Sequence, residues 1–112
     1  NLARCGDNIV ASNYLYGGTY NLFHHTFGRM GIGVKFVDTS DPDNVANAID
    51  THTKAVYVET IANPSGMIPD LAGLSDVAHA AGVPLVVDST MATPYLCRQA
   101  SSSRPTASCR RR

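Results

Sequence analysis

Short apolar runs alternate with segments of helical periodicity along this chain, and this alternation constrains its fold more than any other feature. Each run is too short for a helix and is rich in β-branched residues, as is typical of strands in a buried parallel sheet. Runs of this kind lie within residues 6–12, 34–38, 55–59 and 84–88. The alternation predicts an α/β fold, in which helices lie on the faces of a partial, mostly parallel sheet joined by right-handed crossovers.

The strand at residues 85–88 is the most informative of these. Leu85, Val86 and Val87 form an apolar run, which predicts a central strand buried on both faces. The run ends in Asp88, and open α/β sheets bind ligands at the carboxyl ends of their strands. Asp88 is therefore a candidate ligand group. Its alternative role is to cap the following turn, because Asp is common in turns.

Helices are expected between the strands. The second should begin at Asp41 and Pro42, an N-cap acceptor followed by the residue favoured at the first helical position. The third should open near Asp70, and its expected inner face consists of Leu71, Leu74, Ala78 and Ala81. The first helix repeats large apolar side chains at positions i, i+3, i+7 and i+10, the spacing of one helical face. These side chains are Tyr20, Phe23, Phe27 and Met30.

The chain joins two different compositions. Residues 1–97 hold four Lys or Arg side chains and all nine Asp and Glu side chains, whereas residues 98–112 hold five arginines and no acid. Residues 100–112 are rich in Ser and Arg and lack apolar periodicity, which predicts a disordered tail. The abrupt change is typical of a shifted reading frame or a faulty gene-model end, and a basic nucleic-acid-binding or targeting tail is the alternative. The folded part is expected to be residues 1–99.

Composition argues against several classes of protein. No apolar run approaches the roughly 18 residues of a membrane span, and the first residues do not resemble a signal peptide. The three cysteines, Cys5, Cys97 and Cys109, are far apart and form no Cys-x-x-Cys pair. A disulfide framework or a metal site is therefore not expected, whereas a cytoplasmic location is.

Loops follow the carboxyl ends of three expected strands, at residues 13–19, 59–66 and 88–95. In a parallel sheet these ends share one edge, so side chains of the three loops can converge on one ligand. The candidates are Tyr16, Asn63, Asp88 and Thr90. A tyrosine offers a flat ring for stacking, an amide can donate a hydrogen bond, and a carboxylate can pair with a protonated ring nitrogen. A pyridinium cofactor needs such a carboxylate, because a protonated nitrogen makes the ring an electron sink.

Motifs in these same loops, in this order and at these separations, resemble one enzyme family. They are Leu15-Tyr-Gly-Gly-Thr19, Glu59-Thr-Ile-Ala-Asn-Pro64 and Val86-Val-Asp-Ser-Thr-Met-Ala-Thr-Pro-Tyr95. Over roughly residues 1–99 the chain resembles the pyridoxal-phosphate-dependent family of cystathionine γ-synthase and methionine γ-lyase, and within it the O-acetylhomoserine sulfhydrylase group. The resemblance implies a piece of a type I aminotransferase-like large domain that binds pyridoxal 5'-phosphate.

The resemblance also implies roles for the candidate residues. Tyr16 would stack on the pyridine ring and assist proton transfer or departure of the leaving group, and Asp88 would pair with the ring nitrogen. Asn63 would bond the phenolic oxygen of the cofactor, and Thr90 would lie close beneath the ring. Glu59 would support the Asn63 loop rather than contact the substrate.

The chain departs from the family pattern in several places. The family's usual Asn after the strand-end Asp is Ser89 here, and its usual aromatic residue two places later is Met91. The Ser-x-x-Lys segment whose lysine holds the cofactor is not among these residues, and neither Lys35 nor Lys54 is expected near the ligand edge. The family's phosphate-binding Ser-Gly-Met turn is not found either. These residues alone are therefore expected to be inactive.

For the intact enzyme, the resemblance implies replacement of the γ-acetoxy group of O-acetyl-homoserine by sulfide. It further implies a homo-oligomer that acts on small amino-acid substrates and has no nucleic-acid or membrane partner. Within the family, the alternative is a cystathionine γ-synthase or a methionine/cystathionine γ-lyase. The alternative of another class is a non-catalytic truncated remnant or an interaction fragment.

Overall fold

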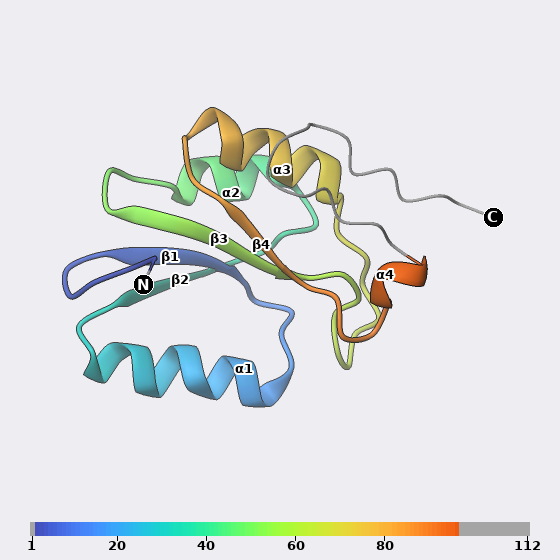
Figure 1. Cartoon of the computed structure of the whole chain (residues 1–112), viewed down its shortest axis with the longest axis horizontal. Coiled ribbons are helices and arrows are strands. Elements are labelled where there is room, and N and C mark those ends of the chain that lie inside the picture. The colour runs from blue at the N-terminus through green and yellow to red at the C-terminus, as the bar shows by residue number, and fades with distance from the viewer. Residues whose placement is uncertain (1, 97–112) are drawn as a thin grey trace.

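The computed structural model describes residues 2–96, which form a sheet with helices on both faces (Figure 1). Within these residues the sheet has four parallel strands in the order β2-β1-β3-β4. The strands are β1 (Asn8–Ser12), β2 (Gly33–Val37), β3 (Thr53–Glu59) and β4 (Leu85–Asp88). The predicted α/β fold with a mostly parallel sheet is confirmed. The boundary predicted at residues 99 and 100, and the tail beyond it, lie outside the described residues.

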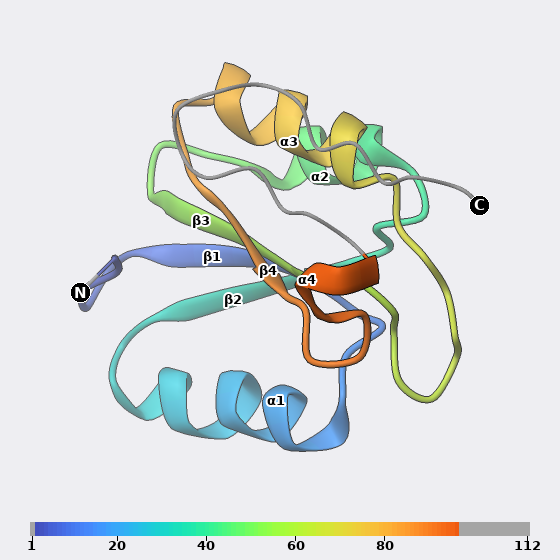
Figure 2. The same ribbon diagram turned by 45° about the vertical axis from the view of Figure 1, so that its right-hand side comes forward.

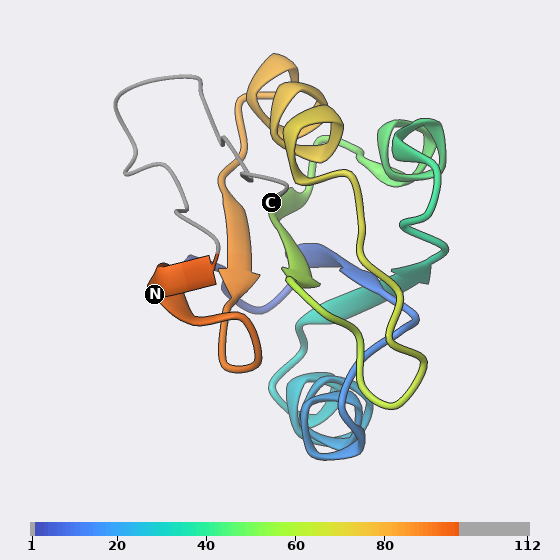
Figure 3. The ribbon, with the colours of Figure 1, turned by 90° about the vertical axis from the view of Figure 1, so that its right-hand side faces the viewer.

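The helices divide between the two faces of the sheet. Helices α2 (Pro42–Ala48) and α3 (Leu71–Ala80) lie on one face, and α1 (Gly17–Asn21) lies on the other (Figures 1 and 3). α1 continues directly into the π-helix η1 (Leu22–Phe27), and the short α4 (Thr93–Leu96) follows the loop after β4. A parallel sheet needs cover on both faces, and these helices supply it to the inner strands.

Each face of the sheet has its own apolar core. On the side of α2 and α3 the core is built from buried strand and helix residues, namely Val10, Val45, Val56, Val58, Leu74 and Ala78. On the side of α1 and η1 the buried residues are Ile9, Ala11, Leu15, Phe23 and Ala55. Adjacent residues of β1 and of β3 alternate between the two cores, because successive side chains of a strand point to opposite faces.

The predicted helix starts are confirmed. Asp41 Oδ1 accepts a hydrogen bond from the backbone N–H of Asp43 at 3.0 Å, and Pro42 occupies the first position of α2. At the start of α3, Asp70 Oδ1 accepts a hydrogen bond from the N–H of Gly73 at 3.1 Å. These bonds satisfy amide groups that a helix leaves without partners at its N-terminus.

Two predicted helix faces need correction. Ala81 is exposed and caps α3, whereas Val77 packs on the core instead. In the first helix Phe23 is buried and the ring of Tyr20 packs on Phe36 of β2, as the predicted face requires, whereas Met30 is 59% exposed. The π-helix that precedes Met30 explains this difference, because its i→i+5 hydrogen bonds change the angle between successive side chains.

The central position predicted for the strand at residues 85–88 is not seen among residues 2–96. β4 pairs with β3 and lies at the edge of the sheet. All of its residues are half-buried, whereas Val10 in β1 and Val56 in β3 are fully buried. An apolar run shows that a strand needs cover, but it does not show which neighbours supply that cover.

We expect Leu74→Ala to lower the free energy of unfolding by about 2–5 kcal/mol, because it opens a cavity in the core beneath α3. Leu22→Ala is the matched control, since Leu22 is also helical but is 45% exposed. The free energy of unfolding of Leu22→Ala should stay within about 0.5 kcal/mol of the wild-type value. Urea unfolding followed by circular dichroism measures both values. Equal losses in the two variants would show that α3 does not pack on the sheet as described.

Candidate functional site

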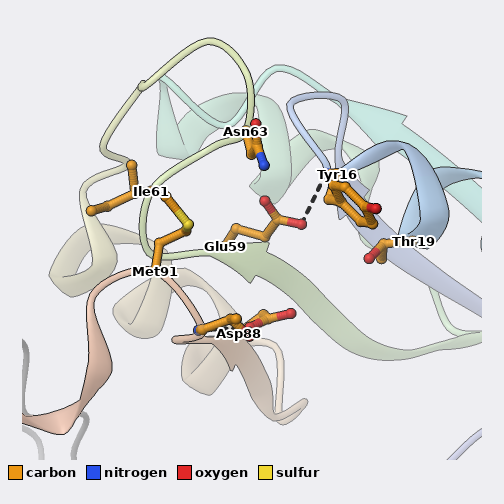
Figure 4. A pocket seen from close by; sticks show the side chains of 8 residues that line it. Tyr16, Thr19, Glu59, Ile61, Asn63, Asp88 and Met91 are labelled. Atoms are coloured by element: carbon orange, nitrogen blue, oxygen red, sulfur yellow. Dashed lines mark hydrogen bonds between the residues drawn. The ribbon is translucent and has the colours of Figure 1, made fainter.

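The loops that follow β1, β3 and β4 lie together at the carboxyl edge of the sheet (Figure 2). They enclose a cleft of about 220 Å³ (Figure 4). The side chains that line it are Tyr16, Thr19, Glu59, Ile61, Asn63, Asp88, Thr90 and Met91. The structure thus brings all four predicted site residues to one cleft. The cleft is smaller than complete ligand pockets, which measure about 300–1,000 Å³.

Asp88 lies at the end of β4, where two other residues hold its carboxylate. Its Oδ1 accepts hydrogen bonds from the backbone N–H of Thr90 at 2.9 Å and from the Thr90 hydroxyl. Its Oδ2 accepts a hydrogen bond from the hydroxyl of Tyr57 at 3.3 Å. The Thr90 hydroxyl lowers the pKa of Asp88 most, the Thr90 N–H follows, and Tyr57 adds a smaller effect, while burial opposes all three. The carboxylate is therefore charged at neutral pH, as pairing with a protonated ring nitrogen requires.

The turn-capping alternative for Asp88 is realised together with its place in the cleft. A bond from the N–H two residues later to an Asp side chain is the usual way in which Asp stabilises a turn. Because this bond uses Oδ1, it leaves Oδ2 for other partners. The hydroxyl of Thr90 also serves Asp88, so the predicted place of Thr90 beneath a cofactor ring stays a prediction.

Tyr57 is a site residue that the sequence reasoning missed. It is half-buried, and its hydroxyl reaches Asp88 from the neighbouring strand β3. Burial raises the pKa of Tyr57 to about 12, with a further contribution from the charge of Asp88, so the hydroxyl keeps its proton. The sequence does contain one signal for it: Tyr57 lies two residues before Glu59. Residues two apart in a strand share a face, so Tyr57 is expected on the same side of the sheet as Glu59.

Glu59 supports a different loop from the one predicted. It is 7% exposed, and its Oε1 accepts a hydrogen bond from the backbone N–H of Tyr16 at 3.0 Å (Figure 4). The bond joins the end of β3 to the start of α1, 43 residues earlier. Tyr16 itself is 58% exposed at the cleft. Glu59 therefore fixes the backbone of the tyrosine that is predicted to stack on a ring, instead of the Asn63 loop.

The remaining cleft residues come from the loops after β3 and β4. Asn63 is exposed and lies at the cleft with its amide directed toward Glu59 and Tyr16 (Figure 4). Met91, at a position where the resembled family has an aromatic residue, also lines the cleft and is 59% exposed. The hydroxyl of Ser89 is buried and has no hydrogen-bond partner among the described residues. A ligand can thus meet an amide, a thioether and a carboxylate on this side of the cleft.

Both lysines lie away from the ligand edge, as predicted, and their amines point toward the amino-terminal edge of the sheet. Lys35 Nζ lies 2.6 Å from Asp50 Oδ2 and donates to the carbonyl of Ala48 at 2.8 Å. Lys54 Nζ, at the start of β3, lies 3.7 Å from Asp7 Oδ1. The hydrogen bond from Lys35 is the largest of several that hold the pKa of Asp50 well below its usual range. Neither amine can reach the cleft without breaking its ion pair.

Residues 2–96 contain no group of three or more His, Cys, Asp or Glu side chains arranged to hold a metal ion. None of the helices in that part of the chain has the length and apolar character needed to cross a membrane.

Comparison with known proteins agrees with the resemblance of the motifs. A family model described as "Cys/Met metabolism PLP-dependent enzyme" matches residues 1–101. Homocysteine synthase from Schizosaccharomyces pombe is 60% identical over 89 residues, which are 80% of this chain and 21% of that protein. O-acetyl-L-homoserine sulfhydrylase from Leptospira meyeri is 53% identical over 96 residues, which are 86% of this chain and 22% of that protein.

The fold agrees with a solved structure as well. The structure of O-acetylhomoserine sulfhydrylase from Wolinella succinogenes superposes with a TM-score of 0.83 at 49% identity. The superposition covers 86% of this chain and 27% of the other. The chain therefore spans about a fifth of the length of the curated relatives it matches.

We expect Glu59→Leu to accelerate amide hydrogen exchange at Tyr16 about tenfold or more, because it removes a charged acceptor from the Tyr16 N–H. Glu59→Gln keeps an acceptor oxygen and should retain most of the protection. The N–H of Tyr14, which donates to Ser12 Oγ at 3.1 Å, is the internal control and should not change. Exchange at Tyr16 that is equally slow in Glu59→Leu would contradict the assigned contact.

We expect Thr90→Val to raise the pKa of Asp88 toward its usual value of 3.8. The folded pKa of Asp88 lies below the unfolded one, so the carboxylate contributes stability above the unfolded pKa and loses it as the pH falls through the folded pKa. The variant should thus be less stable than the wild type at neutral pH, and the difference should shrink in acid.

Carbon-13 NMR titration of the Asp88 carboxyl carbon measures the pKa of Asp88. Urea unfolding at neutral pH and in acid measures the difference in stability. Thr51→Val, at an exposed position at the opposite edge of the sheet, is the control. An Asp88 pKa that Thr90→Val leaves unchanged would remove Thr90 as the main cause of the shift.

Proposed function

Because the chain belongs to the family of Cys/Met metabolism enzymes that depend on pyridoxal phosphate, we propose that its cleft is the ring-binding part of the cofactor site. The whole enzyme is proposed to act on O-acetyl-homoserine and to replace its γ-acetoxy group by sulfide. The names of the sulfhydrylase and homocysteine synthase relatives support this choice within the family.

The observation that carries the proposal is the charged carboxylate of Asp88 in a cleft that also contains Tyr16 and Asn63. A pyridinium ring needs a carboxylate for its nitrogen, an aromatic face for stacking and a polar group for its phenolic oxygen. The donor set of the cleft offers one of each, so the residues present fit the cofactor. Bound pyridoxal phosphate supplies an electron sink for charge that develops on the amino-acid substrate.

Each residue of the cleft is proposed to have its own role. Asp88 keeps the proton on the ring nitrogen, and Asn63 bonds the phenolic oxygen. Tyr16 stacks on the ring and, with its exposed hydroxyl, assists proton transfer or departure of the leaving group. Glu59 holds the backbone of Tyr16 through the hydrogen bond to its N–H.

The proposal extends to the organisation of the whole protein. Residues 1–99 are taken as part of the large cofactor-binding domain, and residues 100–112 as a separate tail. The lysine that attaches the cofactor is neither Lys35 nor Lys54, because both are ion-paired at the opposite edge of the sheet. These 112 residues are therefore proposed to recognise the ring without catalysing the reaction. The whole enzyme is proposed to be a cytoplasmic homo-oligomer.

Pyridoxine 5'-phosphate tests ring recognition without a lysine, because it lacks the aldehyde. We expect the chain to bind it and Asp88→Asn to weaken binding about 10- to 100-fold, as loss of a charge-assisted hydrogen bond does. Asp76→Asn, on the exposed side of α3, is the matched control and should leave the affinity unchanged. Isothermal titration calorimetry measures the affinities.

Equal affinity of the wild type and Asp88→Asn would reject the role of Asp88, and no binding by the wild type would reject the cofactor role of the cleft. Borohydride reduction in the presence of pyridoxal phosphate should give no selective labelling of Lys35 or Lys54. Stoichiometric labelling of either lysine would contradict its assignment to the opposite edge.

A further inference from the structure

Tyr57 contacts the carboxylate of the cleft but lies outside the three motifs that carry the family resemblance. Its ring packs edge-on against Phe23, with centroids 4.9 Å apart and planes at 87°. Its hydroxyl donates to Asp88 Oδ2 at 3.3 Å. The ring is thus anchored in the core between the sheet and η1, while the hydroxyl reaches the edge of the sheet. A residue held at one end by packing can fix the position of the group at its other end.

The hydrogen bonds to Asp88 occupy most of its acceptor capacity. A carboxylate offers about four acceptor sites, two on each oxygen. Thr90 fills both sites of Oδ1, with its N–H and its hydroxyl. Tyr57 fills one site of Oδ2. A single site therefore remains, and it belongs to the oxygen that Tyr57 holds.

We propose that Tyr57 is a positioning residue for Asp88, whose hydroxyl fixes Oδ2 so that its remaining acceptor site receives the N–H of the cofactor's pyridinium ring. This inference rests on the proposed function of the cleft. It gives the ring nitrogen one defined partner atom, Asp88 Oδ2, on a carboxylate whose other oxygen Thr90 already holds.

The same contact keeps the shared proton on the cofactor. A donor to the carboxylate stabilises its charged form and makes it a weaker base. The proton between Asp88 and the ring nitrogen is then held by the nitrogen, and the ring remains an electron sink. Tyr57 keeps its own proton because burial and the charge of Asp88 raise its pKa, although the nearby Thr19 hydroxyl acts in the opposite direction. Tyr57 therefore stays a donor throughout the neutral pH range.

Tyr57→Phe tests the inference, since it removes the hydroxyl and keeps the ring that packs on Phe23. The first measurement, on the chain without ligand, is carbon-13 NMR titration of Asp88, and we expect its pKa to rise in the variant. The second uses pyridoxine 5'-phosphate labelled with nitrogen-15 in the ring. Its bound chemical shift should move toward that of neutral pyridine, and its affinity should fall about two- to tenfold.

Tyr14→Phe is the matched control, because Tyr14 also directs its hydroxyl at a carboxylate, Asp38 Oδ2, at 3.5 Å. Tyr14→Phe should leave both the pKa of Asp88 and the nitrogen-15 chemical shift unchanged. Phe23→Leu, which keeps the Tyr57 hydroxyl but loosens its ring, should shift the nitrogen-15 signal in the same direction as Tyr57→Phe and by less.

The outcomes distinguish the role of Tyr57 from the proposed cofactor-binding function of the cleft. An Asp88 pKa or a nitrogen-15 shift that is unchanged in Tyr57→Phe overturns the role of Tyr57 and leaves the cofactor site standing. Failure of the wild type to bind pyridoxine 5'-phosphate overturns the proposed function and with it the ligand role of Asp88 Oδ2. A raised Asp88 pKa together with a shifted nitrogen-15 signal supports both.

Discussion

The geometry of the carboxyl edge depends on the parallel register between β3 and β4. Glu59 lies opposite Asp88 in this register, so both strands end at the same level and release their loops into one cleft. The N–H of Thr60 donates to the carbonyl of Asp88 at 2.9 Å and carries the pairing past the strand ends. A slip of one residue would turn the side chain of Asp88 to the other face of the sheet, away from Tyr57. The contacts of Asp88 follow from this register.

The sequence predicts the features of the fold that have local causes. Asp41 and Asp70 mark helix starts because their side chains bond amides two or three residues later, within the same short segment. The place of β4 at the edge depends instead on which strands pair, and an apolar run carries no information about its neighbours. The exposure of Met30 also depends on more than the pattern of residues, since the π-helix changes a side-chain spacing that the sequence predicts to be regular.

The residues of the site likewise divide into those that can be predicted from local sequence and those that depend on contacts between elements. Tyr16, Asn63, Asp88 and Thr90 can be assigned to one cleft because all four follow the carboxyl ends of parallel strands. Tyr57 could not be found in this way, because it lies inside a strand and reaches Asp88 from the neighbouring one. The partner of Glu59 was also hidden, since its bond to the Tyr16 N–H joins residues far apart in the sequence. Contacts between elements require the three-dimensional arrangement, even where each element is predicted correctly.

The ion pairs of Lys35 and Lys54 have a consequence for the charge balance of the cleft. Each pair joins a lysine to an aspartate away from the cleft, so neither lysine is available to neutralise a carboxyl group there. Among the described residues, the lining of the cleft contains Glu59 and Asp88 and no lysine or arginine. A cleft lined by one sign of charge raises the local concentration of groups of the opposite sign. The cleft therefore favours the approach of a cationic group over that of an anionic one.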